Sequence, residues 1–191
     1  MRWLSLGLIL AVLGAAEARA QVVALGASIT KGYHLPESES WPAKLEALLR
    51  QRGFDVSVSN QGVNGDTTEG ELSRLDSAVP EGTRVVIYES SGNDNKDEQH
   101  FVSDHDANIR TTVSRLRARG IAVIFSDTGP ISDERIARSA GASLCGRLVQ
   151  GVPPEDLEDS PNAGRHPNAR GTDIIAARML PCVLGALRRK G

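Results

Sequence analysis

The segment RVVIYES, residues 84–90, decides the fold class of this chain. Its apolar and aromatic residues follow one another without polar alternation, which is typical of a strand buried on both faces. Three further strands are predicted in QVVALG (21–26), FDVSVSNQG (54–62) and IAVIFSD (121–127). Strands of this kind belong to parallel sheets that are covered by helices on both sides.

Amphipathic segments separate the predicted strands. In SWPAKLEALLRQRG (40–53) apolar side chains recur at helical spacing, with Ser40 as the N-cap and Gly53 as the stop. We also expect helices over 69–78, 104–119 and 133–144, a fifth strand in GRLVQGV (146–152), and a terminal helix over 169–189 that Pro181 kinks. The sequence therefore predicts one α/β domain with a mostly parallel five-stranded sheet.

The first twenty residues, MRWLSLGLILAVLGAAEARA, predict a secretory signal peptide. Arg2 precedes an apolar run over residues 3–16, and a small-x-small ending marks a cleavage site before Gln21. No later segment approaches the roughly 18 apolar residues that span a bilayer. We expect the mature chain, residues 21–191, to be secreted or periplasmic without a transmembrane segment. An uncleaved membrane anchor is the alternative.

The charge balance argues against a polyanionic partner. Without the signal peptide, 20 basic and 23 acidic side chains remain, and no basic stripe is interleaved with aromatic residues. This composition predicts no binding to nucleic acid or to an anionic membrane. The sequence leaves the oligomeric state open.

The chain has two cysteines, Cys145 and Cys182. In an oxidising compartment they can form a disulfide, but two buried thiols would give the same sequence. Both alternatives stay open.

Polar loops follow the predicted strands, at the edge where a parallel sheet binds its ligands. The three loops are GASITKGY (26–33), NQGVNGDTT (60–68) and SSGNDN (90–95). They supply the hydroxyl of Ser28, backbone amides at Gly65 and the side-chain amide of Asn93. His166, in SPNAGRHPN, comes just before the last helix and at the same edge. A hydroxyl, a base and donors for a negative oxygen are what acyl transfer requires.

The order of these four blocks resembles the SGNH or GDSL family of esterases and lipases, over essentially the whole mature chain. The resemblance implies a flavodoxin-like three-layer α/β/α sandwich. It assigns the nucleophile to Ser28, the general base to His166, and the oxyanion hole to Gly65, Asn93 and the backbone amide of Ser28. WPAKLEALLRQRG and NGDTT look most like the exported arylesterase, thioesterase and lysophospholipase branch. The resemblance implies a small-molecule ester or thioester substrate and neither a metal nor an organic cofactor.

Two positions depart from the family pattern. Ala27 replaces an aspartate that normally braces the first loop, and Ala163 stands where the catalytic acid lies, three residues before His166. In a triad that acid orients the imidazole, and spoiling its role costs about 10⁴ in rate. Three outcomes stay open: a serine–histidine dyad with a backbone carbonyl as acceptor, a substitute acid at Asp159 or Asp127, or loss of hydrolysis.

We therefore expect an exported serine esterase that forms an acyl-enzyme on Ser28. One alternative is a non-catalytic periplasmic module that binds an acyl group, which the missing acid favours. Another is a carbohydrate acetylesterase, against which the aromatic content of 4% argues, since few rings are available to stack on sugars.

Two further motifs are interpreted as structural. GASITKG lacks the spacing of a phosphate-binding loop. The acidic stretch DNKDEQHFVSDHD (94–106), with His100 and His105, lacks the spacing of known metal sites. We interpret this stretch as a solvated loop that runs into a helix.

Overall fold

The structure is a computed structural model that describes residues 22–95, 101–128, 131–160 and 164–189. The predicted signal peptide and Ala163 lie outside the described residues. The elements in chain order are β1 (Val22–Gly26), α1 (Ser28–Lys31), η1 (Glu37–Glu39), α2 (Trp41–Gln51), β2 (Val58–Gly62), α3 (Thr68–Ser73), α4 (Leu75–Ala78), β3 (Val85–Tyr88), α5 (His105–Ala118), β4 (Ala122–Phe125), α6 (Ile131–Ser139), β5 (Ser143–Leu144), η3 (Pro154–Asp156), β6 (Leu157–Ser160), β7 (Gly164–Pro167) and α7 (Ala169–Arg188).

The five strands β1 to β5 form one parallel sheet in the order β2-β1-β3-β4-β5. Strand β1 lies between β2 and β3, and its residue Val22 pairs with both Val58 and Val85. Every residue of β1 and β3 is buried. The strand order is that of flavodoxin-like folds, which confirms the predicted fold class.

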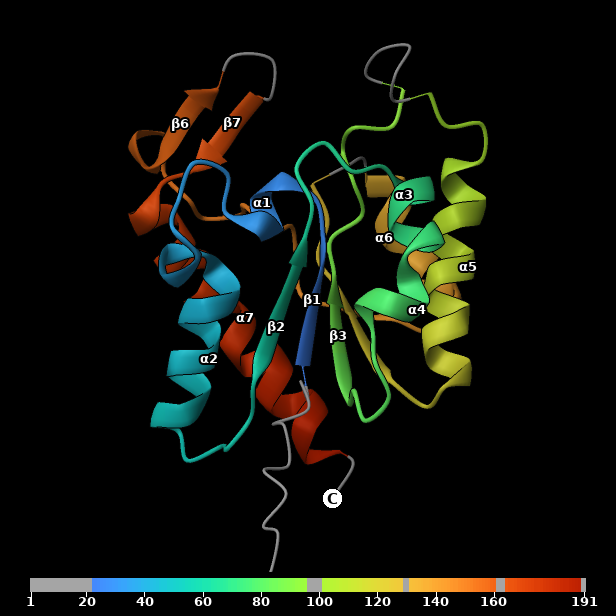
Figure 1. Ribbon diagram of the computed structural model, residues 1–191, viewed down its shortest axis with the longest axis horizontal. Coiled ribbons are helices and arrows are strands. Elements are labelled where there is room, and N and C mark those ends of the chain that lie inside the picture. The colour runs from blue at the N-terminus through green and yellow to red at the C-terminus, as the bar shows by residue number, and fades with distance from the viewer. Residues whose placement is uncertain (1–21, 96–100, 129–130, 161–163, 190–191) are drawn as a thin grey trace, which may run out of the picture.

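Helices cover both faces of the sheet, with α2 and α7 on one face and α3 to α6 on the other (Figure 1). Successive side chains of a strand point to opposite faces, so β1 contributes to both layers. Val22 and Ala24 pack with α2 and α7, whereas Val23 and Leu25 pack with α4, α5 and α6. In the described part of the chain, no helix combines the length and apolarity needed to cross a membrane.

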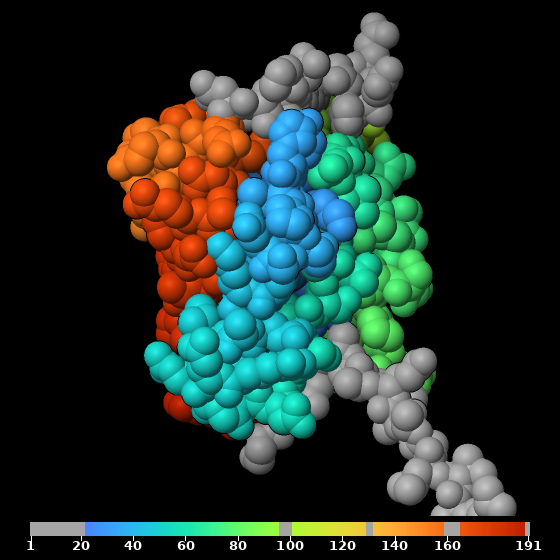
Figure 2. Space-filling model, turned by 60° about the vertical axis from the view of Figure 1, so that its left-hand side comes forward, coloured from blue at the N-terminus to red at the C-terminus, as the bar shows by residue number. Residues whose placement is uncertain are grey.

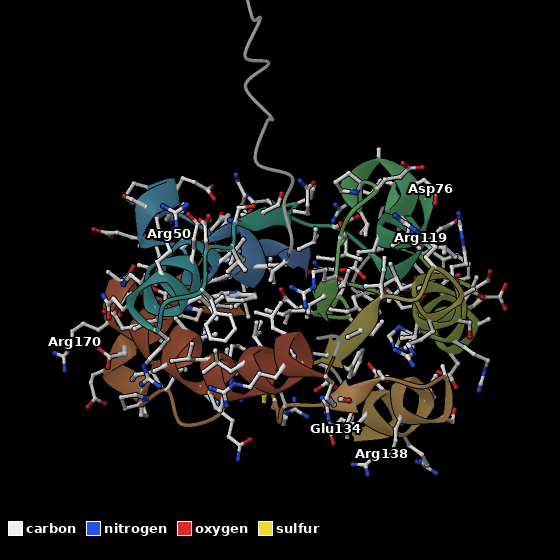
Figure 3. The ribbon with its side chains drawn as sticks, turned by 90° about the horizontal axis from the view of Figure 1, so that it is seen from below. Arg50, Asp76, Arg119, Glu134, Arg138 and Arg170 are labelled. Carbon is white, nitrogen blue, oxygen red and sulfur yellow. A yellow bond between two sulfur atoms is a disulfide. The ribbon has the colours of Figure 1, made fainter. Side chains whose placement is uncertain are left out.

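Charged side chains occupy the outer surfaces of the helices. Arg50 of α2, Arg138 of α6 and Arg170 of α7 point away from the core (Figure 3). Helix α2 follows its predicted signals, because the Ser40 side chain caps the amide of Ala43 and Gly53 takes a positive φ of 79° after the helix.

The structure departs from the prediction mainly in the C-terminal third and also at the helix predicted over 69–78. The fifth strand is β5, and GRLVQGV is not a strand but includes a turn. Helix α6 ends at Ser139 rather than at 144, because Gly141, with φ of 102°, turns the chain so that β5 pairs with β4. The helix predicted over 69–78 divides into α3 and α4 at Arg74. The antiparallel hairpin of β6 and β7 was not predicted. Helix α7 extends as predicted and includes Pro181.

A disulfide joins Cys145 to Cys182. Of the two alternatives left open by the sequence, a disulfide or two buried thiols, the structure contains the disulfide. It attaches the segment after β5 to α7. Arg178 of α7 strengthens the same junction, since its guanidinium donates to the carbonyls of Cys145, Arg147 and Leu148.

We expect replacement of both cysteines by serine to lower the free energy of unfolding by about 2–4 kcal/mol, because the bond closes a loop with a sequence separation of 37 residues. Urea denaturation of the variant and of the oxidised wild type measures the difference. The wild type under reducing conditions should match the variant. Equal midpoints for oxidised and reduced wild type would contradict a stabilising disulfide.

Glu71 of α3 is a buried carboxyl group between α3, β3 and α5. The side chain is fully buried, and neither carboxyl oxygen makes a hydrogen bond of ordinary geometry with another described residue. Burial raises the pKa of Glu71 well above its ordinary value of 4.5, and the nearby charge of Asp66 adds to this effect. The folded state therefore favours the protonated form of Glu71 more strongly than the unfolded chain does.

The substitution Glu71→Gln should stabilise the protein at neutral pH and have little effect near pH 4. Well below pH 4.5, the ordinary pKa of a glutamate, Glu71 is protonated in both the folded and the unfolded state. Above that pH the unfolded chain loses the proton first, so the free energy of unfolding of the wild type falls as the pH rises. Denaturation of both proteins at pH 4 and pH 8 measures this. A difference in unfolding free energy that does not change between the two pH values would exclude a neutral Glu71.

Candidate active site

Ser28 and His166 meet at the carboxyl end of the sheet. Ser28 is the first residue of α1, directly after β1, and His166 lies in β7. Their Oγ and Nε2 atoms are 2.7 Å apart, although 138 residues separate them in sequence. Figure 2 shows the orange β6–β7 hairpin beside the blue segment that contains α1. A serine hydroxyl at this distance donates its hydrogen bond to a neutral imidazole, which is the arrangement of a nucleophile with its base.

A cavity of about 190 Å³ lies beside this contact, and its lining is mostly polar. The polar side chains that line it are Ser28, Glu89, Asn93, Thr128, Arg165 and His166. A larger hollow of about 380 Å³ between α5 and α6 is lined by arginines, serines, Asp106 and Ile136, and contains no nucleophile paired with a base. We therefore place the chemistry at Ser28.

Two of the three predicted oxyanion donors, Asn93 and Gly65, lie on neighbouring loops. Asn93 lines the cavity, and its side-chain amide donates to the carbonyl of Asp66 at 2.9 Å. An amide group has two hydrogens, so the second remains for a substrate oxygen. Gly65 lies in the preceding loop with φ of 74°, next to Asp66. The structure thus brings Ser28, His166 and Asn93 to one cavity, with Gly65 in the loop to which Asn93 is bonded.

Asp127, one of the two predicted substitute acids, is not bonded to His166. Asp127 is fully buried, and neither carboxylate oxygen has a hydrogen-bond partner among the described residues. Burial raises the pKa of Asp127 to about 6, and Arg147 partly offsets this. In the β6–β7 hairpin Asp159 pairs with Arg165, whereas the exposed Glu158 pairs with His166.

Glu89 was assigned only to the end of a predicted strand, yet it braces the nucleophile. It is 2% exposed and accepts hydrogen bonds from the backbone amide of Thr30, at 3.0 Å, and from the Thr30 hydroxyl. Burial raises its pKa to about 7 despite these bonds. A Cβ at Gly26 would lie 2.6 Å from the Glu89 carboxylate, so only glycine fits there. A charged residue that ends a buried strand is the sequence signal that identifies Glu89.

Arg74 joins the loops of the site. Its guanidinium donates to the carbonyl of Gly26 at 3.1 Å and to the Asp66 carboxylate at 2.7 Å. The carbonyl of Asp66 in turn accepts from Asn93 and from the Ser91 hydroxyl. The nucleophile turn, the glycine loop and the asparagine loop therefore form one connected network.

The interpretation of the 94–106 stretch as merely solvated is wrong at its two ends. His105 is half-buried and contacts both Asp94 and Asp133. The sequence could not show this contact, since Asp133 comes from the following helix. No group of histidine, cysteine or carboxylate side chains in the described part of the chain is arranged to hold a metal ion.

Comparisons with known proteins identify the family of this chain. The sequence profile of the GDSL-like Lipase/Acylhydrolase family matches residues 24–174. Esterase TesA of Pseudomonas aeruginosa is 31% identical over 144 residues, which is 71% of this chain and 71% of that protein. An arylesterase of Vibrio mimicus is 37% identical over 95 residues, 49% of this chain and 48% of that protein, so the match spans about half the length of this relative.

The fold has close structural counterparts. The esterase EstA of Pseudoalteromonas sp. superposes with a TM-score of 0.73 at 21% identity, covering 87% of this chain and 98% of that one. This likeness concerns the fold alone, whereas the profile match extends from β1 into α7 and includes Ser28, Asn93 and His166. The chain therefore belongs to the GDSL-like lipase/acylhydrolase family, the SGNH family of ester-bond hydrolases.

Proposed function

We propose that this protein is an exported serine esterase that hydrolyses small acyl or aryl esters or thioesters through an acyl-enzyme on Ser28. The observation that carries the proposal is the 2.7 Å contact between Ser28 Oγ and His166 Nε2 beside a cavity that Asn93 also lines. The similarity to an arylesterase and to esterase TesA supports ester substrates. The disulfide supports export, because such bonds persist in oxidising compartments.

In the acylation step His166 takes the proton of Ser28 as the hydroxyl oxygen attacks the carbonyl carbon of the ester. The carbonyl oxygen becomes negative and is stabilised by the side-chain amide of Asn93 and the backbone amides of Gly65 and Ser28. His166 then gives the proton to the leaving alcohol or thiol, and the acyl group stays on Ser28. In deacylation a water molecule repeats the sequence, with His166 as base and Ser28 as the leaving group.

We further propose that a backbone carbonyl accepts the second N–H of His166, as in a serine–histidine dyad, because Ala163 stands where the family has its catalytic acid. Neither carboxylate oxygen of Asp127 makes a hydrogen bond with a described residue, and the strand register places Asp159 opposite Arg165. The strand register places Glu158 opposite His166. Glu158 is exposed, so solvent screens the interaction of its carboxylate with the imidazole.

A non-catalytic binding module is less well supported, because binding an acyl group requires neither a base at hydrogen-bond distance from Ser28 nor an oxyanion donor. The small cavity would suit an acetyl group, but nothing in its lining favours a carbohydrate over another alcohol. We therefore retain the esterase as the proposed function.

The substitution Ser28→Ala should lower kcat/KM for a short-chain aryl ester at least about 10⁴-fold, because it removes the nucleophile. The assay uses the mature protein purified from the periplasm, whose first residue is expected to be Gln21. Ser77→Ala, an exposed serine of α4, is the matched control and should leave kcat/KM unchanged. Equal background rates for wild type and Ser28→Ala would instead favour the binding module.

Three single variants test the dyad: Asp127→Asn, Asp159→Asn and Glu158→Gln. Each should keep kcat within about threefold of wild type if no carboxylate assists His166. A true catalytic acid would cost about 10⁴ in rate when neutralised. A loss of 100-fold or more in one folded variant, measured by kcat with circular dichroism as the check on folding, would identify that residue as the acid and refute the dyad.

A further inference from the structure

His105 lies between two buried carboxylates behind the asparagine loop. Its Nδ1 is 2.8 Å from a carboxylate oxygen of Asp94, and its Nε2 is 3.1 Å from one of Asp133. The two aspartate side chains are only 4% and 0% exposed. Because each ring nitrogen faces an acceptor, both nitrogens carry a proton and the ring is an imidazolium. Hydrogen bonds to Asp133 and Asp94 raise the pKa of His105 to about 10, so the charge persists at neutral pH.

Asp94 connects this cation to both loops of the oxyanion hole. It directly follows Asn93, and its carboxylate accepts from the backbone amide of Thr68 at 2.8 Å and from the Thr68 hydroxyl. Thr68 begins α3, just after the Gly65 loop. Burial alone would raise the pKa of Asp94, but the bonds from His105 and Thr68 hold it below its ordinary value.

Asp133 anchors the other side of the imidazolium to α6. Its side chain is completely buried, and among the described residues its other hydrogen bonds are weak ones from Ser90 and Ser132, each at 3.4 Å. Among the described residues, His105 is the one cation within ion-pair distance of either aspartate. Within the described part of the chain the two buried carboxylates therefore share a single positive charge, and removing one partner from such an arrangement is costly.

We propose that His105 is a positioning residue that holds the oxyanion donor Asn93 in place through its ion pairs with Asp94 and Asp133. This inference rests on the proposed esterase function, since it assigns Asn93 its role in stabilising the substrate oxygen. Oxyanion donors stabilise a transition state only when they are held at the correct distance before the reaction. The Asp66 carbonyl fixes Asn93 from one side, and the Asp94–His105–Asp133 bridge fixes the adjoining residue from the other.

Removal of the ring leaves two buried carboxylates without a counter-ion. At neutral pH one of them must take up a proton or turn toward solvent, and either change alters the loop that carries Asn93. At lower pH one of the two aspartates binds a proton, which neutralises part of this buried negative charge. The other charged groups around the bridge are Asp104, the N-cap of α5, Asp106 in its first turn, Glu134 on α6, and Asp127, which interacts with both Asp133 and Arg147.

The first experiment compares kcat, KM and their pH dependence for wild type and His105→Ala. We expect kcat to fall about 10-fold at pH 8 with KM nearly unchanged, because the donor acts on the transition state. The ratio of variant to wild-type kcat should rise as the pH falls toward 5, since protonation replaces the missing cation. Asp106→Ala, an exposed neighbour on the same helix, is the control and should show neither effect.

Two more variants separate positioning from general destabilisation. Adding Asp133→Asn to His105→Ala removes one orphaned charge and should raise kcat at pH 8 several-fold above His105→Ala alone. His105→Gln keeps a donor without the charge, so it should fold and show the same pH-dependent ratio even if His105→Ala does not fold. Two results would overturn the proposal. One is a folded His105→Gln variant with the kcat of the wild type. The other is a loss of kcat that does not change with pH and that Asp133→Asn does not reduce.

These outcomes differ from a failure of the esterase function itself. If Ser28→Ala retains full turnover, Ser28 is not the nucleophile and the proposed function fails. If Ser28→Ala is inactive while the His105 variants behave as wild type, the esterase stands and only the positioning role is refuted.

Discussion

The parallel pairing of β1 with β2 and β3 is the constraint on which the site depends. Parallel strands end at the same edge, so the loops after β1, β2 and β3 must converge there. The register aligns Gly26 at the end of β1 with Gly62 at the end of β2, and the following loops supply Ser28, Gly65 and Asn93. A shift of the β1 register by one residue would turn each of its side chains toward the opposite helix layer. Because both faces of β1 are packed against helices, this register is fixed, and with it the convergence of the loops.

Convergence alone does not fix atomic positions, and the polar network supplies that precision. Arg74 and Asp66 join the three loops, and Glu89 holds the turn that Ala27 leaves without its usual acid. These groups are charged or titratable and largely withdrawn from water, where hydrogen bonds are stronger and unpaired groups are more costly. Conformations in which some of these hydrogen bonds are broken are therefore costly. This favours one rigid arrangement of the three loops.

The sequence predicted the parts of the fold that have a periodic or local signal. Strands β1 to β4, helix α2 with its Ser40 cap, and helix α7 follow from apolar spacing and capping residues. The strand β5 was misplaced because two residues carry no period and are defined only by pairing with β4. Short motifs drew attention to Ser28, Asn93 and His166, which the structure brings to one cavity, whereas no motif pointed to Glu89, Arg74 or the His105 bridge. Their roles depend on partners that are distant in sequence, and loop composition does not encode such distances.

A serine–histidine dyad, as proposed for Ser28 and His166, changes which part of the site matters most. Serine hydrolases that lose a member of the triad still exceed the uncatalysed rate by about 10³–10⁴-fold, and this remainder comes from the oxyanion hole and substrate binding. An enzyme that works as a dyad has already lost part of the contribution of its base, so a larger share of catalysis falls on its oxyanion donors. Those donors are effective only if the protein holds them in place without reorganisation. The buried ion pairs and hydrogen bonds behind Asn93 and beneath Ser28 are then as important to this site as the groups that touch the substrate.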